Sequence, residues 1–392
     1  MTDDKSLSLR TRLVHGARPA PGQRRPVNPP VVRASTVLYE NIGALRETRR
    51  LRAAGERQFA YGTGGTPTTH ALEDMIADLE GGYRCRLSGS GLAAIAFGLM
   101  PFARPGDHVL ITDAAYEPVR NFAKGFFAPF GIEFDYYKAD GQDFESRIKP
   151  NTKLVFAEVP GSLVFEMCDL RKMTAITRPR GIIVAVDNTW GSGIHYQPLA
   201  LGADVSIMAG TKHIVGHSDV LLGTVTTTKE AWGPVDKFHS ICGICIGGDD
   251  AYLAMRGART MAARLPVHQE NARILCNWLQ ARPEISRVYW PALESHPGHD
   301  IWKRDFKGAC GLFSAEFKAP QAKVDAFVDA LKLFGIGASW GGYESLVIPA
   351  GVQSTRTVTD WSKHGPIIRF HAGLEDPKDL IADLEQALRH VA

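Results

Sequence analysis

The stretch "GIIVAVDNTW", residues 181–190, decides the fold class. Its apolar residues run continuously from Ile182 to Val186 and are followed directly by a carboxylate, Asp187. A continuous rather than alternating apolar run is typical of a strand buried on both faces, as in parallel sheets. Three further segments of this kind are "DHVLIT" (107–112), "TKLVFAEV" (152–159) and "ADVSIMA" (203–209). Helical patterns separate them, which predicts an α/β fold with a mainly parallel central sheet covered by helices.

The pattern changes along the chain and predicts three parts. Residues 1–60 are rich in Pro and Arg and indicate an extended N-terminal arm. Residues 61–255 hold the strands above and form a large, cofactor-binding domain. Residues 256–392 predict a smaller α+β domain. A long helix over 249–282, broken near Pro266, leads into it, and strands at 311–318 and 366–373 alternate with helices at 321–334 and 376–391.

Composition excludes several classes of protein. The 392 residues are 44% hydrophobic and 22% charged, with a net charge of +3, which is too small to indicate nucleic acid or a membrane surface as a partner. The arginine-rich run 46–57 is interpreted as a solvated helix face. No apolar run reaches the roughly 18 residues of a membrane helix, and the N-terminus lacks a signal-peptide pattern, so we expect a cytoplasmic protein. The CxxC pair Cys242 and Cys245 lacks further metal ligands and is interpreted as two buried thiols.

Four polar features fall where strands end. Asp187 ends the most apolar strand, Lys212 follows the strand at 203–209, and Tyr116 follows the strand at 107–112. The Gly/Ser loop 88–91 precedes a helical segment and suits phosphate binding. Desolvating a lysine is costly, so Lys212 among small and apolar residues calls for a function. The set suits pyridoxal 5'-phosphate: a lysine to form an imine, a carboxylate for the pyridine nitrogen and an aromatic ring to cover the cofactor.

Two rival patterns overlap these residues. Residues 89–94, "GSGLAA", fit G-x-G-x-x-A, and Asp113 lies about 20 residues on, as in a nicotinamide-dependent oxidoreductase. The preceding segment 83–88, with two arginines, is however a poor candidate for a buried strand. His213 and His217, four residues apart, hint at a metal, but Gly216 interrupts any helix that would align them, so no metal site is predicted.

Residues 209–223, "AGTKHIVGHSDVLLG", resemble the lysine motif of the Cys/Met-metabolism pyridoxal-phosphate enzymes. The resemblance covers nearly the whole chain, and it continues through "YGTGGTPTTHALE" (61–73), "VDNTWGSG" (186–193), "SWGGYESL" (339–346) and "IIRFHAGLED" (367–376). Trp190, Ala209 and Trp340 resemble the cystathionine β-lyase branch of the family.

The resemblance implies a type I pyridoxal-phosphate-dependent transferase fold and a homotetramer built from dimers with shared active sites. It implies a small-molecule amino-acid substrate that is cleaved by β-elimination. Cystathionine or a related cysteine thioether would give a thiol, pyruvate and ammonia. The alternatives are a γ-lyase, a γ-synthase, a methionine γ-lyase and a non-catalytic cofactor-binding relative. The implied site residues are Lys212 for the imine and the Cα proton, Asp187 for the pyridine nitrogen, Tyr116 over the ring, Gly91, Leu92, Thr211 and Thr63 around the phosphate, Tyr61 from a neighbouring subunit, and Ser339, Arg369 and Trp340 around the substrate.

The chain departs from the family at the arm and near Tyr116. Thr63 stands where the family usually has an arginine for the cofactor phosphate. Gly64 and Asn121 stand where the branch places an arginine and an aspartate for the distal end of cystathionine. Arg120, beside Asn121, is the main candidate to replace the missing charge. The departures imply looser recognition of the distal end of the substrate.

Overall fold

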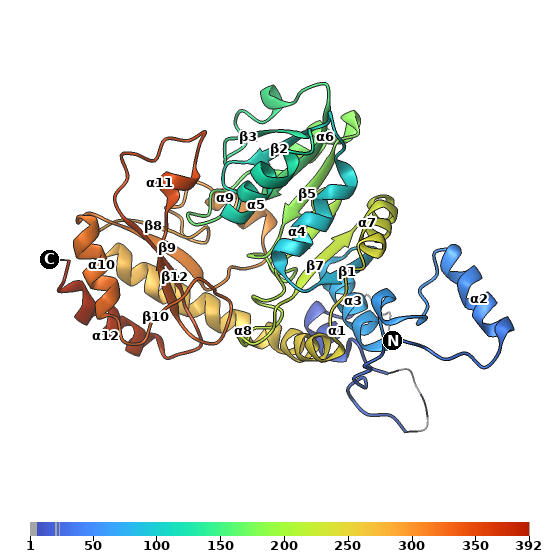
Figure 1. Cartoon of the computed structure of the whole chain (residues 1–392). Helices are drawn as coiled ribbons and strands as arrows, with labels where there is room; N and C mark the ends of the chain where they lie inside the picture. Colours follow the sequence, from blue (N-terminus) through green and yellow to red (C-terminus); the bar gives the residue numbers. More distant parts are fainter. Residues whose placement is uncertain (1–5, 20–21, 23, 392) are drawn as a thin grey trace.

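A seven-stranded sheet, here the large sheet, forms one half of the protein (Figure 1). The structure is a computed structural model and describes residues 6–19, 22 and 24–391. The strand order is β1-β7-β6-β5-β4-β2-β3, and only β7 runs against the others. The strands are β1 (Arg84–Ser88), β2 (His108–Thr112), β3 (Glu133–Tyr137), β4 (Thr152–Glu158), β5 (Ile183–Asp187), β6 (Val205–Met208) and β7 (Gly223–Thr227).

Helices and apolar packing cover both faces of the large sheet. In β4, Leu154 and Phe156 belong to a core with residues of α4, α5 and α7, whereas Val155 and Ala157 belong to a second core on the other face. This arrangement confirms the predicted α/β fold with a mainly parallel sheet. The helices beside this sheet are α3 (Pro67–Glu80), α4 (Gly91–Leu99), α5 (Glu117–Phe122), α6 (Leu170–Thr177) and α7 (Lys229–Ile241). Short 3-10 segments occupy Gly62–Gly64, Met100–Phe102, Glu145–Arg147, Arg178–Arg180 and Pro198–Leu201, and Ala123–Phe127 is a π-helical turn.

A five-stranded sheet, here the small sheet, forms the other half. Its order is β10-β11-β12-β9-β8, and only the pair of β10 and β11 is parallel. The strands are β8 (Ile285–Tyr289), β9 (Leu312–Phe317), β10 (Gly335–Ile336), β11 (Leu346–Pro349) and β12 (Ile367–His371). The accompanying helices are α9 (His299–Asp305), α10 (Gln321–Ala330), α11 (Val352–Thr355) and α12 (Pro377–Leu388).

The 33-residue helix α8 (Gly248–Gln280) joins the two halves (Figure 1). Met255 and other residues of its first part share a core with α3 and with α1 (Leu9–His15), whereas Leu275 and its neighbours pack into the core of the small sheet. The predicted break near Pro266 is wrong, because packing along both parts outweighs the roughly 3 kcal/mol that an interior proline costs. The division into 1–60, 61–255 and 256–392 stays a prediction, and its second boundary lies within this helix. In the described residues, no helix combines the length and the apolar character needed to cross a membrane.

The segment from residue 36 to residue 61 projects from the body and carries α2 (Ile42–Ala53), which has no buried residue (Figure 1). The chain leaves and re-enters the body at one place, since Thr36 pairs with Tyr61 across an isolated bridge and Gly62 N donates to Ser35 O at 2.8 Å. The arginine-rich run therefore does lie mostly on an exposed helix, as its composition indicated.

Two local expectations fail. Residues 84–88 do form a strand, because β1 is an edge strand and the charge of Arg86 is matched by Glu73 and Asp236. Cys242 and Cys245 are not buried: both are exposed, at the end of α7 and in the loop before α8.

Candidate active site

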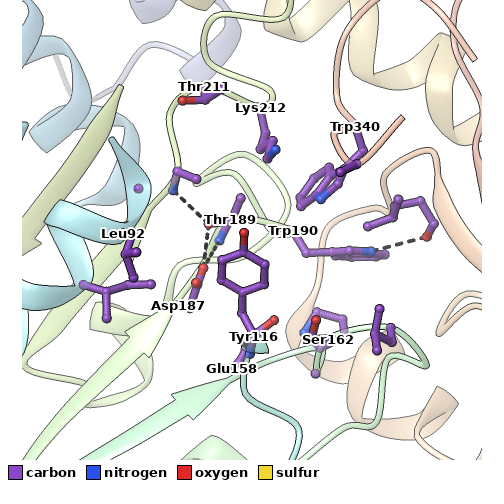
Figure 2. Close-up of a pocket in the computed structure, with 18 of the residues that line it drawn as sticks. Leu92, Tyr116, Glu158, Ser162, Asp187, Thr189, Trp190, Thr211, Lys212 and Trp340 are labelled. Carbon is purple, nitrogen blue, oxygen red and sulfur yellow. Dashed lines mark hydrogen bonds between the residues drawn. The ribbon is translucent and has the colours of Figure 1, made fainter. Parts of the chain in front are cut away.

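A cavity of about 260 Å³ lies at the carboxyl edge of the large sheet, where the small sheet closes over it. Glu158 and Asp187 are the last residues of β4 and β5, and Lys212 follows the end of β6. Trp340 reaches the same cavity from the loop before β11, and Arg369 reaches it from strand β12 of the small sheet. Figure 2 shows Asp187 and Leu92 on one side of the Tyr116 ring, with Trp190 and Trp340 on the other. Parallel strands thus place their terminal side chains at one edge, as the sequence predicted.

Lys212 presents its amine to the cavity. The Nζ atom donates to Ser339 Oγ at 2.9 Å and lies 5.8 Å from the centre of the Trp340 ring. Burial, and to a smaller extent the Arg369 cation, lower the pKa of Lys212 to about 8. Much more of this lysine is therefore an uncharged amine near neutral pH than of an exposed lysine.

Asp187 is buried at the cavity wall. Thr189 donates to its Oδ1 twice, from the backbone N at 2.9 Å and from Oγ1 at 2.6 Å. Thr189 is itself fixed, because its Oγ1 accepts from Ala209 N at 2.9 Å. Both donations reach the same oxygen and leave Oδ2 for a partner in the cavity. Burial raises the pKa of Asp187, so the ionised form calls for a cationic or N–H partner.

Tyr116 stands at the start of α5 with its ring in the cavity (Figure 2). Its backbone N donates to Glu158 Oε2 at 2.7 Å, which ties the base of the ring to β4. Burial, and next the neighbouring Asp187, raise the pKa of Glu158 well above its usual value. Both effects favour the neutral acid form of Glu158 beside the Asp187 carboxyl group.

The N-terminus of α4 points at the other end of the cavity. Ser90 caps this helix by accepting from Ala93 N at 3.1 Å, and the first N–H groups, at Gly91 and Leu92, have no intrahelical partner. A Cβ on Gly91 would lie 2.5 Å from Ala209 Cβ, so the close approach of α4 to β6 requires glycine. The Thr211 hydroxyl also lines the cavity, but it donates to Leu222 O at 3.2 Å and must turn to bind a ligand.

Arg369 and Ser339 form the third side. Arg369 Nη2 donates to Ser339 O at 3.1 Å, and burial lowers the pKa of this guanidinium to about 10. An arginine held at a buried edge in this way has the fork geometry that suits a carboxylate. Together with Trp340, these residues make a cationic pocket with an aromatic wall next to the Lys212 amine.

Two predicted residues lie elsewhere in the same chain. Tyr61 is exposed on the projecting segment, and Thr63 lines a separate small pocket with Arg86 and His239. Neither lines the cavity of Lys212. Their predicted entry into the site of a neighbouring subunit stays a prediction.

The rival sites find no support in the geometry. The carboxylate of Asp113 accepts from the backbone N of residues 357, 358 and 359 and from Arg120, so it anchors a loop of the small-sheet half and is not placed for a ribose. His213 is fully buried against Trp340, and His217 Nδ1 bonds Val215 O at 2.7 Å. Within the part of the chain that the structure describes, no group of three His, Cys, Asp or Glu residues could hold a metal ion.

The model of the Cys/Met metabolism PLP-dependent enzyme family matches residues 10–389. The chain belongs to this family. Among its relatives, the cystathionine beta-lyase of Bordetella avium is 43% identical over 398 residues, with 100% of both chains covered. The cystathionine beta-lyase of Escherichia coli (strain K12) is 37% identical, with 99% of both covered. The structure is similar to the cystathionine gamma synthase of Xanthomonas oryzae pv. oryzae solved with cystathionine, with a TM-score of 0.89, 29% identity and 98% of both chains covered.

Members of this family depend on pyridoxal phosphate, and the cavity fits that group. It has an amine of lowered pKa at Lys212, a carboxylate with a free oxygen at Asp187 and free N–H groups at the start of α4. These are the partners for the aldehyde, the pyridine nitrogen and the phosphate, and the roles of the individual residues stay predictions.

Thr189 and Glu158 were missed by the sequence reasoning. The rule that selected Asp187 also applies to Glu158, because it is the last residue of the apolar strand "TKLVFAE". Thr189 follows Asp187 by two residues, the spacing at which a side chain and backbone N can both reach an aspartate oxygen.

Proposed function

We propose that this chain cleaves cystathionine, or a related cysteine thioether, by β-elimination. The observation that carries the proposal is that the Lys212 amine of lowered pKa lines one cavity with the Asp187 carboxylate and the Arg369 guanidinium. The relatives named as cystathionine beta-lyases support the choice of substrate. The reaction is cystathionine plus water to homocysteine, pyruvate and ammonia.

In the proposed reaction each residue of the cavity has a role that follows from its position. Bound pyridoxal phosphate supplies an electron sink for the Cα carbanion of the amino acid. Arg369 and Ser339 hold the α-carboxylate, which places Cα near Lys212. The Lys212 amine takes the Cα proton, since its lowered pKa suits a general base. Asp187 holds the proton of the pyridine nitrogen, and Tyr116 covers the ring. The β C–S bond then breaks and the thiol leaves.

We further propose a cytoplasmic homotetramer whose active sites are completed in pairs. Tyr61 and Thr63 are exposed away from the cavity of their own chain, as residues that serve a neighbouring site would be. This assembly rests on the family resemblance and on those two positions.

A panel of thioethers tests the reaction. The purified, cofactor-loaded protein is offered cystathionine, S-methylcysteine, cystine and methionine, and pyruvate and 2-oxobutyrate are measured separately. We expect pyruvate from the cysteine derivatives and none from Lys212→Ala. Release of 2-oxobutyrate as the main product from cystathionine would instead show γ-elimination, the activity class of other members with this fold.

A further inference from the structure

The cavity has cations at one end only. Among the described side chains that line it, the cationic ones are Lys212 and Arg369, and both contact Ser339. The opposite end, at the start of α4, offers backbone N–H groups and the hydroxyls of Ser90 and Thr211. A phosphate dianion seated there would have no charged donor from its own chain, although charge-assisted hydrogen bonds are the strong ones in such sites.

The rim of the cavity is apolar and uncovered. Leu221 is 66% exposed although it lines the cavity, and Leu92 and Tyr116 are also large side chains left partly exposed at the same rim. Apolar side chains exposed around a cavity mark either a ligand-binding groove or a surface that another protein covers.

The projecting segment carries a second uncovered apolar set. Leu38 is 92% exposed, and Ile42 and Tyr61 are also exposed, while α2 has no buried residue at all. A helix without a buried face gains no packing from its own chain. The chain therefore has two exposed apolar surfaces, one at the rim of the cavity and one on the projecting segment. In a two-fold dimer the projecting segment of each copy can cover the cavity rim of the other, so that both surfaces are buried. We therefore take a second copy of this chain as the occupant.

Arg52 is the cation that this arm presents beside Tyr61. Its Nη2 lies 3.9 Å from the position that a Cβ on Gly64 would take, so the guanidinium lies alongside the Tyr61–Gly64 turn. Arg50, on the same helix, forms an ion pair with Glu47 at 2.7 Å. The exposed Arg52 forms no ion pair with a carboxylate of the described residues. The side chain is exposed and its charge is free to bind an anion.

We propose that Arg52 of one copy donates to the phosphate of the pyridoxal phosphate held in the cavity of a second copy. The proposal rests on the cofactor and the paired sites of the proposed function, and adds the residue that completes the phosphate site. The α4 N–H groups bind the phosphate from its own chain, and the guanidinium fork closes it from the partner.

Cofactor affinity tests the proposal without turnover. The cofactor-free protein is titrated with pyridoxal phosphate and, separately, with pyridoxal, which lacks the phosphate. Arg52→Ala should raise the Kd for pyridoxal phosphate about 10- to 100-fold, the size of one charge-assisted hydrogen bond. Its Kd for pyridoxal should stay unchanged, and Arg49→Ala, on the same exposed helix, should bind both as the unmodified chain does. Equal weakening for both ligands, or no weakening, would overturn the proposal.

Mixed assemblies test whether the contact crosses between copies. Arg52→Ala and Lys212→Ala are dissociated and reassembled together, and visible absorbance reports only cofactor joined to Lys212. The mixed pairs contain sites with an intact Lys212 and an Arg52 from the other copy, so tight binding should return in these sites. If tight binding does not return in the mixed assemblies, a contact between copies is refuted.

The preference for cystathionine gives a second check. If Arg52→Ala lowers this preference while the cofactor affinity stays unchanged, Arg52 binds the substrate and the phosphate contact is refuted. Pyruvate release plays no part in the titrations, so failure of the lyase proposal would be seen separately.

Discussion

Lys212 shows how the position of a side chain prepares it for chemistry. Its amine is held by Ser339 and lies 5.8 Å from the centre of the Trp340 ring, and both burial and the Arg369 cation disfavour its charged form. The lowered pKa follows from that position and not from any feature of the lysine itself.

The first prediction is the pH dependence of cofactor capture by Lys212. Only the uncharged amine attacks the aldehyde, so the capture rate should rise about tenfold per pH unit at low pH and level off above about pH 8. A lysine of ordinary pKa would continue to rise to about pH 10. Stopped-flow absorbance of the cofactor-free protein measures the midpoint. In Arg369→Leu the midpoint should move to higher pH, since the cation that disfavours the ammonium is gone.

Asp187→Asn should bind the cofactor but lose about 10²-fold in kcat. A neutral amide cannot stabilise a protonated pyridine nitrogen, and a charged hydrogen bond contributes roughly 1.5–3 kcal/mol. Pyruvate release gives the rate, and Asp219→Asn, an exposed position in the lysine motif, is the control. A rate within a few-fold of the unmodified chain would show that another group fixes the pyridine nitrogen.

The positions of individual site residues were predictable where the residue follows an apolar strand in the sequence. Asp187 and Lys212 follow apolar runs, so their place at the sheet edge follows from the parallel order of the strands. The engagement of Thr211 with Leu222 was not predictable, because it depends on the path of a loop that returns eleven residues later.

At the scale of the elements, the site depends on how closely α4 approaches the end of β6. Gly91→Ala would place a Cβ 2.5 Å from Ala209 Cβ and 3.0 Å from its Cα, so the helix start must move. Such overpacking costs roughly 1–3 kcal/mol. We expect a lower Tm and weaker cofactor binding in the same titration. Gly89→Ala is the matched control, because nothing lies within 4 Å of its Cβ, and it should be close to neutral. Equal effects of the two substitutions would contradict the close-approach argument.

Elements with an unbroken apolar run were predictable, and edge elements were not. β4 and β5 lie in the middle of the large sheet and needed apolar residues on both faces. β1 lies at the edge, where Arg86 meets Glu73 and Asp236, so its sequence lacks that signal. Pro266 was read as a break because local propensity says nothing of the packing on either side.

At the scale of the whole molecule, the choice of substrate depends on which charged side chains can contact the distal end of the substrate. Arg120 does not fill the missing charge: it is buried, bonded to Asp113 and stacked 3.9 Å from the centre of the Tyr136 ring. Asn121 is exposed and uncharged. In the proposed site the remaining recognition is that of the amino-acid head, to which we assign Arg369, Ser339 and Trp340.

We therefore predict that kcat/KM for cystathionine exceeds that for S-methylcysteine by less than about a thousandfold. Asn121→Asp should widen this preference by roughly 10–150-fold, the contribution of one charge-assisted contact to the distal ammonium. Asn121→Leu, which adds bulk without charge, should not. A larger preference in the unmodified chain would mean that another residue supplies the contact.

The fold class and the cavity of one chain were predictable from the pattern of apolar residues, whereas the expected pairing of copies came only from the family resemblance. Periodicity describes how a chain covers its own strands. It carries no information on which exposed apolar residues, such as Leu38 or Leu221, meet those of another copy.

The sharing of α8 between the two cores has a consequence for how the molecule melts. The first part of this helix fills the core around α1 and α3, and its second part fills the core of the small sheet. Loss of either core exposes apolar side chains on the same helix and so weakens the other core. The two halves should therefore denature as one cooperative unit, with a single calorimetric peak. Because the cavity lies between them, binding competence and thermal integrity disappear at the same temperature.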